Sequence, residues 1–74
     1  MVKVLSMKID SISGEKRSVV VNLVADTQDE VTACGTSGDG IVGLTADDTM
    51  AFGSMALCVD GSSGMLDSTG QWKW

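Results

Sequence analysis

The sequence predicts a mainly β protein: a small antiparallel sheet of hairpins, with an N-terminal hairpin, a C-terminal three-stranded meander, and an irregular or short-helical acidic segment between them. Two observations carry this prediction. The first 25 residues alternate and are rich in β-branched side chains. The last 22 residues hold short apolar runs separated by Gly-flanked polar clusters, which are typical of tight hairpin turns. With 74 residues we expect one small domain, 1–74.

The N-terminal hairpin is predicted from two strands and the turn between them. Residues 2–9 alternate well enough for a strand, with Lys3, Leu5, Met7 and Ile9 on one face. Residues 10–17 supply turn chemistry around a Ser-Gly pair, and residues 18–25 form the strand richest in β-branched residues.

The second strand has more apolar surface than one small domain readily covers. Val19, Val21 and Leu23 share one face, whereas Val20 and Val24 lie on the other. An uncovered run of this kind invites pairing with other chains, so we expect a homo-oligomer that packs through Val20 and Val24. The alternative is that the middle segment folds over this second face.

The acidic middle segment has two interpretations. Residues 26–35 form either a short helix or an acidic loop; in the helix, Asp26 is the N-cap and Gly35 the C-terminal stop. Residues 36–40 are rich in turn formers, residues 41–44 are a short apolar anchor, and residues 45–48 resemble the start of one helical turn.

In the C-terminal meander, alternation places Met55, Leu57 and Val59 on the face that we expect to meet the core. Trp72 and Trp74 share a face of the last strand. Tryptophan is enriched at interfaces, so both are candidate interface residues, although Trp72 is also expected to cap the small core.

Several classes of function are disfavoured by composition. The chain has no His and no Tyr, so neither a Ser nor a Cys has the usual base to activate it, and we expect no catalytic site and no enzyme activity. Cys34 and Cys58 fall short of a zinc ligand set, and residues 36–48 do not match a calcium loop; we expect no metal and no cofactor. The two cysteines either pack as small apolar side chains or form a disulfide.

Charge and hydropathy also limit the partners. Residues 18–72 carry eight acidic side chains and no basic one, which disfavours binding to nucleic acid. The longest uninterrupted apolar run, 55–59, is far shorter than the ~20 residues of a membrane span, and the N-terminal residues lack the apolar stretch of a signal peptide. We therefore expect no membrane partner.

A resemblance adds to these inferences. The pattern from residue 41 onward includes Gly43-Leu44-Thr45, residues 51–60, and a final segment 65–73 that ends in Asp-Ser-Thr-Gly-Gln-Trp-Lys. It resembles the ends of small tailed-phage and prophage structural proteins of the head-fibre-like or tail-fibre-like kind, over the last 34 of 74 residues.

The resemblance implies a non-enzymatic structural protein of the virion or its fibres that works through homo-oligomeric β packing. It also implies a trimer, other virion proteins as further partners, and location in the virion or the host bacterial cytoplasm. The alternative function is a small binding module that recognises a carbohydrate or a protein through Trp72 and Trp74.

Overall fold

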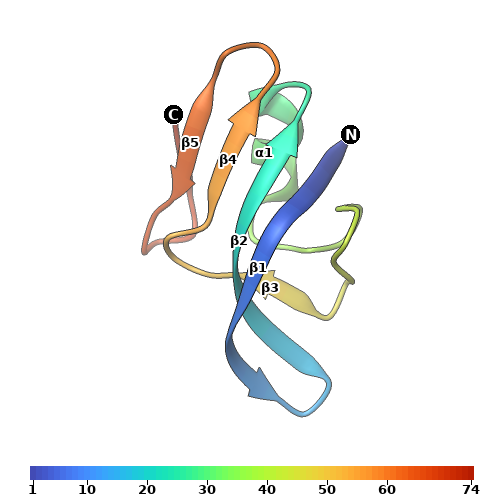
Figure 1. The fold of residues 1–74 in the computed structure, drawn as a ribbon. Coiled ribbons are helices and arrows are strands. Elements are labelled where there is room, and N and C mark those ends of the chain that lie inside the picture. The colour runs from blue at the N-terminus through green and yellow to red at the C-terminus, as the bar shows by residue number, and fades with distance from the viewer.

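The structure is a computed structural model that describes residues 1–74, and it folds into one six-stranded sheet with one short helix (Figure 1). The mainly β prediction is confirmed. In chain order the elements are β1 Val2–Ser13, β2 Lys16–Ala25, α1 Gln28–Cys34, β3 Asp48–Met50, β4 Met55–Cys58, β5 Ser63–Leu66 and β6 Trp72–Lys73.

The N-terminal hairpin is confirmed, and it is longer than predicted. Strands β1 and β2 pair in antiparallel fashion as far as Ser13 and Lys16, because Gly14, with φ of 64°, allows a turn much tighter than the predicted 10–17 loop. The far end of the hairpin therefore projects beyond the rest of the molecule (Figure 1).

Irregularities in β1 change which side chains share a face. The register of β1 against β2 shifts between Val4 and Ser6, and again between Ile9 and Ser11. Lys3 therefore pairs with Val24, whereas Met7 pairs with Val21 on the opposite face. The prediction that Lys3, Leu5, Met7 and Ile9 share one face is wrong, because a bulge inserts a residue and reverses the alternation beyond it.

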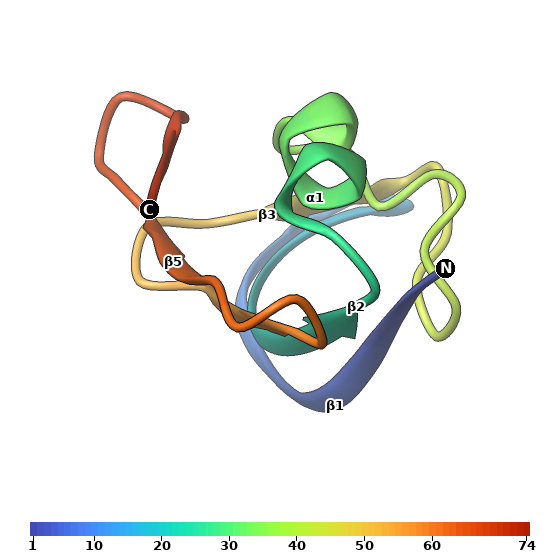
Figure 2. The ribbon, with the colours of Figure 1, turned by 90° about the horizontal axis from the view of Figure 1, so that it is seen from above.

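Two faces of the sheet can now be defined. The inner face carries Val19, Val21 and Leu23, each at most 1% exposed, and it is covered by α1 (Figure 2). The outer face is the opposite one, and it carries Val20 and Val24, which are half-buried.

The helical interpretation of the middle segment is confirmed for Gln28–Cys34. The N-cap is Thr27 rather than Asp26: its hydroxyl accepts a bond from the backbone N–H of Glu30. Gly35 ends the helix with φ of 59°, as predicted. Val31, fully buried, anchors the helix to the inner face, so the middle segment does not pack over Val20 and Val24, which stay half-buried on the outer face.

The two halves of the protein join through parallel strands, which the antiparallel prediction did not include. Strands β3 and β4 both pair with β2 in parallel, one after the other along the same edge. The connection through α1 brings the chain back in the direction that parallel pairing needs. Residues 45–48 form a tight turn into β3 instead of the start of a helix.

Ser54 fills the gap where β3 ends and β4 begins. The backbone N–H of Val21 finds no carbonyl partner there and donates instead to the Ser54 hydroxyl, at 3.1 Å. Ser54 is fully buried, so its hydroxyl continues the hydrogen bonding of β2 through the break.

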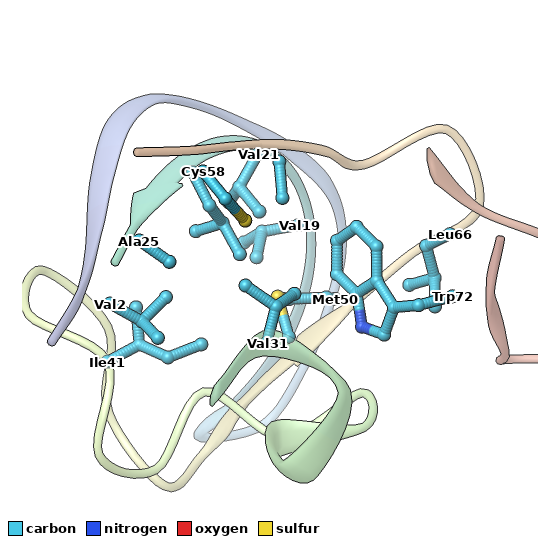
Figure 3. Packing of buried hydrophobic residues seen from close by; sticks show 12 residues of the cluster. Val2, Val19, Val21, Ala25, Val31, Ile41, Met50, Cys58, Leu66 and Trp72 are labelled. Carbon is cyan, nitrogen blue, oxygen red and sulfur yellow. The ribbon is translucent and has the colours of Figure 1, made fainter. Parts of the chain in front are cut away.

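The segment that follows α1 connects to the sheet at two strands, β3 and β1. Ser37 forms an isolated bridge with Thr49 of β3, and Val42 forms one with Lys3 of β1. The core lies between the sheet on one side and α1 with the segment that follows it on the other (Figure 3). It contains Val2, Val19, Val21, Leu23, Ala25, Val31, Ile41, Met50, Ala56, Cys58, Leu66 and Trp72.

The C-terminal meander is confirmed: β4, β5 and β6 pair in antiparallel fashion in chain order. Its predicted orientation is wrong. Ala56 and Cys58 face the core, whereas Met55, Leu57 and Val59 are 44%, 61% and 84% exposed. Because β4 pairs with β2, Ala56 lies beside Leu23 and faces inward as Leu23 does. Larger side chains such as Trp72 already fill the interior, so the small side chains of Ala56 and Cys58 fit there.

Both cysteines are free thiols. Cys58 is buried, and Cys34 is half-buried against the core. Burial raises the pKa of each thiol, because it disfavours the charged thiolate. They therefore behave as small apolar side chains, one of the two predicted alternatives.

Candidate functional site

The most distinctive surface is the outer face of the sheet, where large apolar side chains from neighbouring strands lie together. Cross-strand pairing places Val24 beside Leu57, and Met55 beside Met65. Leu57, Met55 and Met65 are 61%, 44% and 45% exposed, so about half of each side chain stays open to solvent in the single chain. We call the outer apolar face the group formed by Leu5, Val20, Val24, Met55, Leu57 and Met65.

This face is hollowed into an open groove of about 560 Å³. Residues of β1, β2, β4, β5 and the C-terminal segment line it, among them Leu5, Asn22, Leu57, Met65 and Trp74. A volume of this size lies in the range that proteins use to hold a ligand or an inserted side chain.

The charged groups of the outer face are cations. Lys3 is the cross-strand partner of Val24, Lys8 of Val20, and Lys73 of Met65. Lys73 also lines the groove, and the lining contains no carboxylate. Its ammonium lies 3.9 Å from Asp67, and the side chain is 67% exposed, so this ion pair leaves the lysine largely free to meet a partner.

Trp72 and Trp74 occupy different environments. Trp72 is 8% exposed in the core, and its indole N–H donates to the carbonyl of Gly35 at 2.8 Å. Trp74 is 39% exposed and donates to the Thr32 hydroxyl at 3.1 Å. The rings stack at 6.0 Å between centroids, and the Trp74 ring also lies against Gly64 of β5. Of the two residues, only Trp74 is among those that line the groove.

The structure therefore separates the four residues expected at an interface. Val20 and Val24 lie on the outer face, Trp74 lies at the edge of its groove, and Trp72 belongs to the core.

Sequence reasoning missed the groove residues Met55, Leu57 and Met65 as interface candidates. For β4 the reason is that alternation predicts Met55 and Leu57 on the face that meets the core. A signal for the correct assignment was present: both alternating sets of β4 are apolar, and the set with the smaller side chains, Ala56 and Cys58, fits a crowded core.

The one buried carboxylate, that of Asp48, has a structural role. Asp48, 1% exposed, accepts bonds from Arg17 Nε at 2.7 Å and Nη2 at 3.0 Å, and from the Thr45 backbone N–H at 2.9 Å. The Arg17 guanidinium, aided by Thr45, holds the pKa of this carboxyl below its usual range. With its acceptors engaged, Asp48 ties β2 to β3 and is not available as a proton acceptor.

The structure brings no three His, Cys, Asp or Glu side chains together as a metal site, and every buried side-chain polar atom has a hydrogen-bond partner. The helix is too short to cross a membrane.

Comparison with models of protein families gives no matching family, and comparisons with curated proteins and with solved structures give no match either.

Proposed function

We propose that this protein is a non-enzymatic structural component that works by packing against further copies of itself through the outer apolar face. The observation that carries the proposal is the exposure of Leu57, Met55 and Met65 on adjoining strands around one groove. Contiguous apolar surface of this kind marks interaction sites on small proteins.

The expected strength of association follows from this exposure. Full burial of a Leu or Met side chain contributes roughly 1.5–3 kcal/mol, and these side chains are about half exposed, so each adds roughly 1 kcal/mol when covered. Association costs roughly 4–15 kcal/mol in lost freedom of motion. The apolar side chains alone therefore support weak association, and tighter assembly needs charge complementarity or several contacts per copy.

Light scattering over a wide range of protein concentrations, with reductant present, tests the proposal. We expect a mass that rises to a multiple of 7.7 kDa. The double variant Val24→Thr with Leu57→Ser removes apolar surface from two cross-strand neighbours and should return the protein to a monomer.

A matched control is Ile12→Ser, because Ile12 is 62% exposed, like Leu57 at 61%, but lies near the far end of the hairpin, away from the groove. The control should assemble as the parent does. Circular dichroism verifies that each variant is folded. A parent protein that stays monomeric at every concentration contradicts the proposal.

The biological setting that we propose is a phage or prophage, with the protein on the virion or its fibres, in line with the resemblance of residues 41–74. Its support is that resemblance together with an architecture suited to packing. Genes for head or tail proteins beside the encoding gene would support the setting, and a locus without any phage gene would contradict it.

A second candidate function is a binding module for a carbohydrate or a protein, and the observation that favours it is Trp74 beside the groove. Saturable changes in Trp fluorescence on titration with glycans would support it. No change for any glycan, combined with self-association, would favour the structural role.

A further inference from the structure

We propose that the copies associate head to tail: the groove of one copy receives Val59, in the turn just after β4, from the next copy. This inference rests on the proposed function and specifies which two surfaces meet. It also specifies the symmetry, since unlike surfaces generate rings or filaments rather than a two-fold dimer.

Val59 is suited to be the inserted group. It is 84% exposed, more than any other large apolar side chain in the protein. The turn that presents it is firmly held: the Val59 N–H donates to the Ala25 carbonyl at 2.9 Å, and the Asp60 carboxylate accepts bonds from the backbone N–H and the hydroxyl of Ser62. A preorganised turn loses little conformational entropy when it binds.

Charge distinguishes this arrangement from the pairing of two identical faces. The outer face carries Lys3, Lys8 and Lys73, so two such faces would bring lysines against lysines. The Val59 end carries charges of both signs: Lys3 and Asp26 line a hollow beside Val59, and Asp60 follows it in the turn, with its pKa lowered by the Ser62 hydroxyl. An acidic turn and a groove with Lys73 on its lining are complementary.

Val59 cannot enter the groove of its own chain. β4 supplies part of the groove lining through Met55 and Leu57. Val59 follows in the turn after β4, beside Lys3 and Val24 of the outer face. Val59 therefore lies at one end of the outer face and cannot turn back into a groove that its own strand builds. Val59 is not among the residues that line the groove, so the inserted group and the receiving surface of one copy are separate sets of residues.

Two variants that each damage one surface test the inference. Met65→Asp places a carboxylate in the groove, where it would oppose Asp60 of the next copy, and Val59→Asp removes the inserted apolar group. Each variant alone should associate at least about tenfold more weakly than the parent. An equimolar mixture should form a one-to-one complex of twice the 7.7 kDa chain mass, because each variant retains the surface that the other lacks.

The outcomes separate this inference from the proposed function. If Val59→Asp assembles as the parent does while Met65→Asp does not, identical faces pair, and the head-to-tail inference is overturned while the proposed function stands. A mixture that stays monomeric also overturns the inference. A parent that never associates overturns both. Should Met65→Asp unfold, Lys73→Glu replaces it, since Lys73 is 67% exposed.

Discussion

The hydroxyl of Ser54 offers the sharpest test of how the two halves of the sheet are held together. Replacing Ser54 with Ala removes the acceptor of the Val21 N–H, and both residues are at most 1% exposed, so water cannot take its place. A buried donor left without a partner costs about 1–3 kcal/mol. A chain of 74 residues has a total stability of about 4–11 kcal/mol, so the loss is a large fraction of it.

Chemical denaturation followed by Trp fluorescence measures this change. We expect the midpoint to fall, and the melting temperature to drop by about 4–8 °C per kcal/mol lost. The matched control is Ser68→Ala, because Ser68 is exposed and its hydroxyl makes no hydrogen bond; this variant should stay within about 0.5 kcal/mol of the parent. Equal stability of the two variants would refute the role assigned to the Ser54 hydroxyl.

Two further predictions concern the C-terminal edge and the buried ion pair. Gly64→Ala would place a methyl group 2.7 Å from the Trp74 ring and 2.9 Å from the Lys73 carbonyl, so we expect a loss of about 1–3 kcal/mol and a change in Trp emission; an unchanged denaturation curve would contradict this packing. Asp48 has a pKa below its unfolded value of about 3.9, because Arg17 stabilises the carboxylate, so its contribution to stability is present above that pH and is lost as the pH falls through the folded pKa. The difference in free energy of unfolding between the parent and Asp48→Asn should therefore be constant above about pH 5 and shrink below pH 4, and a difference that does not change with pH would contradict the assignment.

Local patterns predicted the elements well and their orientation less well. The hairpin, the helix stop at Gly35 and the order of the meander strands follow from alternation and glycine positions, which are local properties. The faces of β1 could not be predicted, because a single inserted residue between Val4 and Ser6 reverses the alternation, and nothing in the local sequence marks it.

The candidate site could be predicted only where it depends on local sequence. Val20 and Val24 were assigned to an uncovered face because β2 is apolar on both sides, and that property depends on β2 alone. The face of β4 depends on its partner: parallel pairing with β2 sets Ala56 inward and Leu57 outward. That pairing is a long-range contact, which alternation within β4 cannot indicate.

The parallel joint between β2 and β4 also has a consequence for the order of folding. Val21 and Ser54 are 33 positions apart, whereas the β1–β2 hairpin closes through a two-residue turn. Closing a long loop costs more entropy than closing a short one, so we expect the two hairpin regions to form first and the joint to form last. Pulsed hydrogen exchange during refolding should then show the Val21 amide protected later than the amides that bond β1 to β2; simultaneous protection would contradict this order. Until the joint closes, the edge of β2 stays open to a strand from another chain, so the rate of this single step determines how long a newly made chain is exposed to misassembly.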